Sequence, residues 1–171
     1  MQKVKRMVIL LFVLLSCVGC DQATKLLAQQ HLATAPVQEY GNGLFRLIYA
    51  ENPGAFLSLG ATLSPAMRFW VFVVLAAALL VGIGVAALRF SSHTPIQVVI
   101  ALALILGGGL SNVIDRILNE GRVIDFMQIG IPQLRTGIFN VADMALMAGL
   151  AVMFIVALRD AKTNPEIPTA E

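Results

Sequence analysis

Two aspartates stand beside long apolar segments of the chain, where an ionised carboxyl needs a reason to be present. Asp143 lies one turn inside an apolar segment that continues to Leu158, and Asp125 follows the preceding apolar segment. An ionisable group at membrane depth costs a few kcal/mol or more, so it is a candidate functional residue. Two carboxyls brought together can share one proton and divide the roles of acid and base. The pair therefore predicts amide hydrolysis at a membrane surface.

The composition indicates an integral membrane protein. Of the 171 residues, 58% are hydrophobic and 13% are charged, and the mean hydropathy is +0.82. A soluble domain contains about 25% charged residues. The net charge of +2 is small and dispersed, which argues against a nucleic-acid partner.

Four apolar segments are candidates for membrane spans, each of which needs about 20 residues. The first is short, but it extends to Leu27 if its polar groups face protein or the interface. The segments are Met7–Cys20, Phe69–Leu88, Ile96–Ile114 and Ile138–Leu158. The sequence therefore predicts an all-α membrane protein with four transmembrane helices. We expect residues 1–161 to form a single membrane domain and residues 162–171 to form a disordered tail.

Glycines in two of these segments predict places where helices approach one another closely. Gly82 and Gly84 lie in the second segment, and Gly107–Gly109 lie in the third. The three consecutive glycines would admit another helix or an extended substrate backbone.

The connections over residues 33–65 and 117–137 are too polar to span. In the first, an alternating pattern surrounds Gly41-Asn42-Gly43, which predicts a small β-hairpin. Ser64 followed by Pro65 matches the usual start of a helix. Both connections would lie on the same side of the membrane.

The distribution of basic residues bears on the orientation in the membrane. An even number of spans puts both termini on one side, and the Lys and Arg residues divide equally between the two sides. A tight basic cluster, Lys3, Lys5 and Arg6, precedes the first span without a nearby acid. We therefore expect both termini in the cytoplasm.

The first span also resembles a lipoprotein signal, because basic residues and an apolar stretch lead to Leu14-Leu15-Ser16-Cys17. Three further spans follow, and Asp21 and Lys25 continue the same helical face, so we expect an uncleaved span. Cys17 and Cys20 are interpreted as small apolar fillers rather than as a disulfide or a metal pair.

Polar residues near the spans form candidate site groups. Asp21 and Lys25 are four residues apart and would stack on one helix face; they are either a structural ion pair or part of the site. Asn52-Pro53-Gly54 predicts a turn in which the Asn52 amide both donates and accepts hydrogen bonds.

Two further groups lie at span boundaries. Asn112, Asp115 and Arg116 share a helix face at the end of the third span, as an interfacial cap or as part of a site. We interpret Arg116 as orienting the helix end rather than binding phosphate. Asn140 and Asp143 are three residues apart and point the same way from the start of the fourth span. The chain can fold back between Asp125 and Asp143, so the sequence permits the two carboxyls to meet.

Together these groups resemble the bacterial lipoprotein signal peptidases, or type II signal peptidases. Any one match would be weak, but five in order along most of the chain are specific. The matching blocks are residues 21–25, 51–56, 108–116, 123–126 and 139–143.

The resemblance implies an inner-membrane aspartyl endopeptidase that removes the signal peptide from prolipoproteins whose lipobox cysteine carries diacylglyceryl. It implies sensitivity to globomycin, and a fold with a small extracytoplasmic β-cradle and a short surface helix between the third and fourth spans. We expect the active site toward the periplasmic face, and a monomer. The implied catalytic pair is Asp125 and Asp143. The implied supporting residues are Asp21, Lys25, Asn52, Gly54, Asn112, Arg116 and Asn140.

Other chemistries remain open. No metal or cofactor is expected, because His31 and His93 are isolated in sequence. Ser111 or Ser58 as a nucleophile with Lys25 as its base is a residual alternative. A proton-coupled transporter would also place acids in a membrane, and an assembly factor would use polar faces to join helices.

Overall fold

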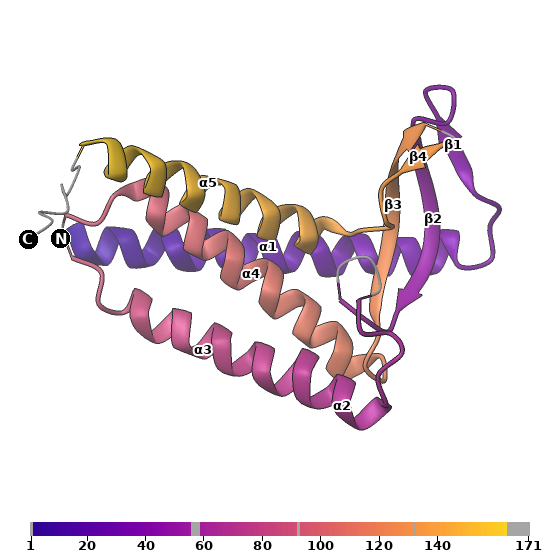
Figure 1. Ribbon diagram of the computed structural model, residues 1–171, viewed down its shortest axis with the longest axis horizontal. Coiled ribbons are helices and arrows are strands. Elements are labelled where there is room, and N and C mark those ends of the chain that lie inside the picture. Colours follow the sequence, from indigo (N-terminus) through magenta and orange to yellow (C-terminus); the bar gives the residue numbers. More distant parts are fainter. Residues whose placement is uncertain (1, 56–58, 92, 132, 164–171) are drawn as a thin grey trace, which may run out of the picture.

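The computed structural model describes residues 2–55, 59–91, 93–131 and 133–163, and it contains four long helical segments with a small sheet across one end (Figure 1). Each segment is long and apolar enough to cross a membrane. The four predicted spans are therefore confirmed. The first span is α1 (Gln2–Leu32). The second combines α2 (Pro65–Phe69), the π-helical segment η2 (Trp70–Leu75) and α3 (Ala76–Ala87). The third is α4 (Ile96–Leu118) and the fourth is α5 (Val141–Thr163).

The helix limits extend beyond the apolar segments. Helix α1 is continuous through Cys17, and the segment that resembles a lipobox lies within it. The second span begins as predicted, because Pro65 occupies the first turn and Ser64 Oγ accepts a hydrogen bond of 3.3 Å from the Met67 N–H. Of the predicted tail, Lys162 and Thr163 belong to α5, and residues 164–171 lie outside the described part of the chain.

A four-stranded antiparallel sheet joins the two connections (Figure 1). The predicted hairpin is confirmed as β1 (Gln38–Tyr40) and β2 (Phe45–Asn52). The remaining strands are β3 (Val123–Ile131) and β4 (Leu134–Arg135). Strand β2 pairs with β3 so that Ala50 is opposite Asp125.

The expectation of a short surface helix between the third and fourth spans is wrong for the described residues. The described residues between α4 and α5 form β3 and β4 rather than a helix. The physical reason lies in the sequence of β3, which is rich in β-branched and aromatic residues. Pairing with β2 then satisfies its backbone groups.

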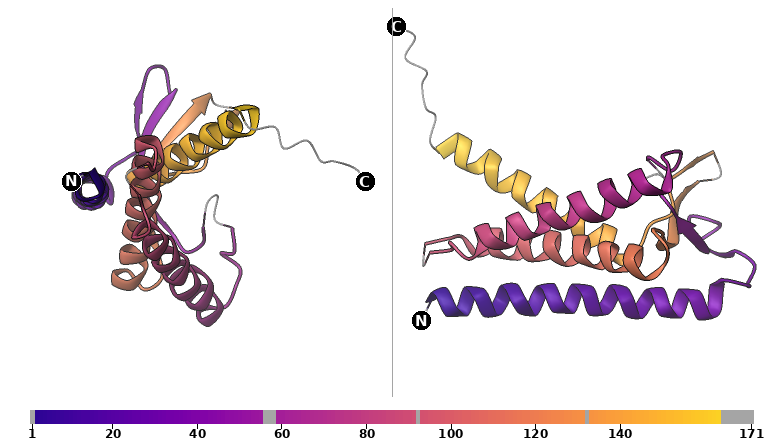
Figure 2. Two further views of the ribbon diagram at one scale, coloured as in Figure 1. Left: turned by 90° about the vertical axis from the view of Figure 1, so that its left-hand side faces the viewer. Right: turned by 90° about the horizontal axis from the view of Figure 1, so that it is seen from below.

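Helix α4 lies at the centre of the bundle and packs against the other three spans (Figures 1 and 2). Its three consecutive glycines each meet a different neighbour. Gly107 faces Cys17 and Leu14 of α1, Gly108 faces the Ala142 carbonyl of α5, and Gly109 faces Leu80 of α3. The predicted close helix contact at these glycines is confirmed. Gly109 also lines the cavity described below.

The same prediction is wrong for the second span. A Cβ built on Gly82 or Gly84 would meet no described atom within 4 Å outside its own helix. These two positions therefore make no close contact with another helix.

A buried ion cluster joins the spans below the sheet. The Lys25 ammonium lies 2.6 Å from Asp21 Oδ2, 2.8 Å from Asp115 Oδ2 and 3.0 Å from Asn112 Oδ1. The Lys25 side chain is 2% exposed and that of Asp21 is 0% exposed. Because a buried charge needs a partner, this cluster fixes α1 against α4.

The carboxylates of the cluster extend it to two further elements. Asp21 Oδ1 accepts a hydrogen bond of 2.7 Å from the Ala142 N–H in the first turn of α5. Asp115 Oδ2 accepts one of 3.1 Å from the Ile124 N–H in β3. The elements that carry Asp143 and Asp125 are therefore both tied to the Lys25 cluster.

The glycines allow a matched test of helix packing. In Gly108→Ala the added methyl overlaps the Ala142 carbonyl, so we expect a loss of about 1–3 kcal/mol in the free energy of unfolding. Gly82→Ala adds the same methyl in open space and should be neutral or slightly stabilising. Unfolding in mixed micelles measures both, and equal stability of the two variants would contradict the close contact.

The ion cluster gives a second prediction. Lys25→Met leaves Asp21 and Asp115 buried without their cation, and should lower the free energy of unfolding by about 3–5 kcal/mol. Lys3→Met removes an exposed ammonium from the same helix and serves as the control. A Lys25→Met protein as stable as its control would show that the cluster does not hold the spans.

Candidate active site

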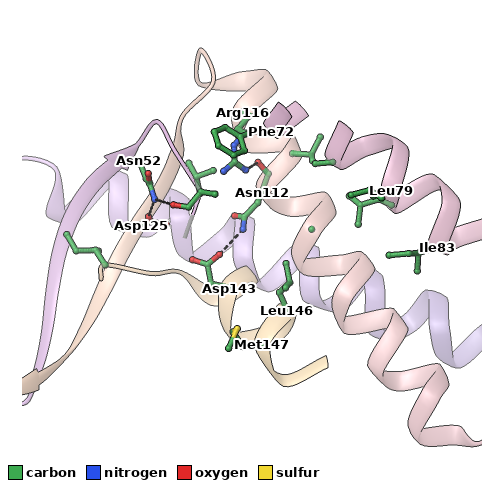
Figure 3. A pocket seen from close by; sticks show the side chains of 17 residues that line it. Asn52, Phe72, Leu79, Ile83, Asn112, Arg116, Asp125, Asp143, Leu146 and Met147 are labelled. Carbon is green, nitrogen blue, oxygen red and sulfur yellow. Dashed lines mark hydrogen bonds between the residues drawn. The ribbon is translucent and has the colours of Figure 1, made fainter. Parts of the chain in front are cut away.

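Asp125 and Asp143 line the same cavity, which has a volume of about 420 Å³ (Figure 3). Asp125 comes from β3 and Asp143 comes from the first turn of α5. The cavity lies where the sheet meets α3, α4 and α5. The chain therefore brings together the two carboxyls that the sequence identified, although they belong to different elements.

Asn140 contacts both carboxyls. Its Nδ2 donates a hydrogen bond of 2.8 Å to Asp125 Oδ1, and its backbone N–H donates one of 3.2 Å to Asp143 Oδ2. The Asp143 N–H donates in return to Asn140 Oδ1 at 2.9 Å. This reciprocal pair is a capping box at the start of α5, so the local sequence Asn-Val-Ala-Asp itself directs Asp143 toward Asn140.

Each carboxyl also receives a hydrogen bond from a second asparagine (Figure 3). Asn52 Nδ2 donates to Asp125 Oδ2 at 3.0 Å, and Asn112 Nδ2 donates to Asp143 Oδ1 at 2.9 Å. The Asn112 amide has one possible orientation, because its Oδ1 accepts from Lys25 and an ammonium only donates. The Asn112 NH₂ group must therefore face Asp143.

The Asn52 amide is held by the turn that follows β2. Its Oδ1 accepts a hydrogen bond of 2.9 Å from the Gly54 N–H, and its Nδ2 also donates to the Ala55 carbonyl at 3.1 Å. Arg116 fixes this turn to α4, since its guanidinium donates to the carbonyls of Gly54 at 2.8 Å and Asn112 at 3.0 Å.

Burial dominates the electrostatics of Asp125, whose exposed fraction is 2%. The pKa of Asp125 is raised to about 6. Burial is the largest cause and the nearby Asp143 carboxyl adds to it, against hydrogen bonds from Asn52 and Asn140 that favour the ionised form. A carboxyl with a raised pKa is suited to hold or release a proton near neutral pH.

The rest of the cavity is apolar. Leu79 and Ile83 of α3 face Leu146 and Met147 of α5 across it, and Phe72 lies beside Arg116 with its ring centre 5.5 Å from the guanidinium carbon (Figure 3). The cavity thus combines a polar end beneath the sheet with an apolar groove that runs between the membrane spans.

The predicted supporting residues divide into three groups. Asn52, Asn112 and Arg116 line the cavity with the two aspartates, while Asn140 and Gly54 hold these side chains in place. Asp21 and Lys25 do not line it. Of the two alternatives for that pair, the structure favours the structural ion pair, which reaches the site through Asn112.

The geometry does not support Ser111 as a nucleophile. Ser111 is fully buried and does not line the cavity, and its hydroxyl donates to Asp21 Oδ2 at 2.7 Å, the oxygen that also pairs with Lys25. Ser58 lies outside the described residues.

Sequence reasoning did not identify Gln22 or the apolar wall of the cavity. Gln22 Nε2 donates to Asp115 Oδ1 at 2.7 Å and to Ser111 Oγ at 2.9 Å, which completes the ion cluster. Its position beside Asp21 was the one available signal. The apolar wall has no such signal in the sequence, because every residue of the second span near it is apolar.

Comparisons with known proteins identify the family of this chain. The family model described as signal peptidase (SPase) II, peptidase family A8, matches residues 13–159. A lipoprotein signal peptidase of Geobacter sulfurreducens is 33% identical over 148 residues, covering 86% of this chain and 90% of that protein. Another from Streptococcus pyogenes serotype M1 is 34% identical over 151 residues, covering 88% and 92%.

Solved structures show the same fold. A bacterial membrane enzyme determined by the in meso method at 2.3 Å resolution superposes with a TM-score of 0.74 at 26% identity, covering 98% of this chain and 94% of that one. A second, at 1.9 Å resolution, gives a TM-score of 0.72 at 26% identity. The chain is thus a multi-pass membrane protein that belongs to the signal peptidase II family of aspartic peptidases, family A8.

Proposed function

We propose that Asp125 and Asp143 are the catalytic pair of an intramembrane endopeptidase that cleaves diacylglyceryl-modified prolipoproteins just before the lipidated cysteine. The observation that carries the proposal is the convergence of both carboxyls on one cavity, where Asn140 contacts each of them. Lipoprotein signal peptidase is also the name of the curated relatives.

The pair would work by general acid–base catalysis with one shared proton. The ionised aspartate takes a proton from water, and the water oxygen bonds to the carbonyl carbon of the scissile amide. The protonated aspartate gives its proton to the carbonyl oxygen, which yields a tetrahedral diol.

Collapse of the diol reverses the two roles. The first aspartate, now protonated, gives its proton to the leaving nitrogen as the carbon–nitrogen bond breaks. The second takes a proton back from a diol hydroxyl. The products are the signal-peptide carboxyl and the free amine of the lipidated cysteine, and the pair returns with its single proton.

The surrounding amides support this cycle. Asn52, Asn112 and Asn140 donate to the carboxyl oxygens and fix their positions without adding a competing base. Arg116 lines the cavity, and its Nε is buried without a hydrogen-bond partner among the described residues. Because this Nε is shielded from the cavity, we assign to Arg116 the role of holding the turn after β2 against α4 through its other donors.

The apolar groove explains why the substrate carries lipid. Leu79 and Ile83 on one side and Leu146 and Met147 on the other offer a path for acyl chains between the spans. Burial of each methylene contributes about 0.8 kcal/mol in transfer from water, although part of this is already gained in the bilayer. The groove therefore serves mainly to orient the cysteine at the carboxyls.

The orientation follows from the basic cluster at Lys3, Lys5 and Arg6, which we assign to the cytoplasmic side. The sheet and the cavity would then lie toward the periplasmic face of a bacterial inner membrane. We further propose that the protein acts as a monomer, and that globomycin inhibits it by occupying this cavity.

A proton path through the bilayer has less support. Asp21 and Asp115 both pair with Lys25, and hydrogen bonds tie them to the elements that carry Asp143 and Asp125, whereas a relay needs groups spread across the membrane. If the polar faces served only to assemble helices, the protein would function without either carboxyl. That alternative therefore predicts no effect of the aspartate variants below, whereas the peptidase predicts a loss of cleavage.

The decisive variants are Asp125→Asn and Asp143→Asn, assayed in purified full-length protein with a diacylglyceryl-modified prolipoprotein. Each removes one proton carrier at constant shape, so kcat should fall by about 100-fold or more. Glu120→Gln removes an exposed carboxylate near the end of α4 and should cleave normally. Cleavage at the unaltered rate by either aspartate variant would reject the catalytic pair.

A further inference from the structure

The end of the bundle opposite the sheet carries another cavity, of about 580 Å³, between the start of α1 and the start of α4. It is lined by Gln2, Lys5, Arg6, Ile9 and Ile96. We propose that this cavity binds an anionic phospholipid, with the phosphodiester headgroup at Lys5 and Arg6 and an acyl chain against Ile9 and Ile96. The peptidase reaction has no use for this site, which lies at the far end of the spans (Figure 1).

The Arg6 guanidinium is held in place at the wall of the cavity. Its Nε donates to the Thr94 carbonyl at 2.8 Å, and its NH1 donates to Gln2 Oε1 at 3.2 Å. These bonds use two of the five N–H donors of an arginine. A guanidinium fixed in this way is pre-organised to bind a phosphate oxygen, and Lys5 adds a second positive charge one residue away.

The charges at this end of the bundle favour an anionic ligand. Neither α1 nor α4 has an acidic residue in its first turn. The basic residues described at this end are Lys3, Lys5, Arg6, Arg89, Arg159 and Lys162, against the single described acid Asp160. Basic pockets between transmembrane helices on the cytoplasmic side, where we assign this end, bind anionic lipid headgroups.

The depth of the site suits a lipid rather than a soluble phosphate. Met7 begins the apolar part of α1, so Lys5 and Arg6 lie within one turn of the hydrocarbon boundary. Ile9 continues toward the bilayer interior and packs on a buried cluster that joins α1, α3 and α4, which includes Leu10 and Val99. A bound lipid would therefore place its phosphate and its chain where the cavity changes from charged to apolar.

The test measures binding of dioleoylphosphatidylglycerol and dioleoylphosphatidylcholine to the full chain in a neutral detergent, by native mass spectrometry. We expect the anionic lipid to bind several-fold more tightly. Lys5→Gln should weaken its binding about fivefold, the ratio that corresponds to ~1 kcal/mol for one lysine near an anionic lipid, and Lys5→Arg should retain it. Lys3→Gln removes the same charge from the same helix outside the cavity and should bind as the unaltered protein does.

Three results would overturn the proposal. Equal affinity for the two lipids would remove the charge selectivity. Equal weakening by Lys5→Gln and Lys3→Gln would indicate diffuse attraction to a basic surface, and displacement of the lipid by an equal concentration of glycerol 3-phosphate would indicate a soluble phosphate ligand. The unfolding temperature without lipid verifies that each variant is folded, and Lys5→Arg separates loss of charge from loss of structure.

Discussion

The pairing of one buried ammonium with two buried carboxylates constrains the rest of the structure. Lys25 is almost inaccessible to water, so Asp21 and Asp115 must both remain close to it. Asp21 Oδ1 then accepts from the backbone of α5, and Asp115 Oδ2, which also faces Lys25, accepts from the backbone of β3. Because these elements carry Asp143 and Asp125, the position of the candidate catalytic pair depends on a charge that takes no part in the proposed chemistry.

The same ammonium also determines the direction of a hydrogen bond within the site. Lys25 requires an acceptor, so Asn112 turns its oxygen toward the ammonium and its NH₂ group toward Asp143. Asn140 acts similarly through its capping box, which leaves its amide nitrogen directed at Asp125. The asparagines thereby hold two carboxyls in one cavity, where ionisation of both at once would be unfavourable.

Much of this site could be predicted from local spacing, and the rest depends on contacts between distant segments. The three-residue interval between Asn140 and Asp143 specifies a shared helix face, and the structure confirms it as a cap. Strand β3 was missed, because its partner β2 lies more than 70 residues earlier, as the pairing of Asn52 with Val123 illustrates. Helix contacts at Gly82 were predicted wrongly, since a uniformly apolar span does not reveal which face meets a neighbour.

The central claim is that the Asp125 and Asp143 carboxyls interact across one cavity. Carbon-13 NMR of the Asp125 side-chain carboxyl, titrated in the unaltered protein and in Asp143→Asn, measures this interaction directly. The pKa of Asp125 should be about 6 in the unaltered protein and should fall when the neighbouring negative charge is removed. An Asp125 pKa that is the same in both proteins would mean that the carboxyls do not sense each other, and would contradict the shared-proton mechanism.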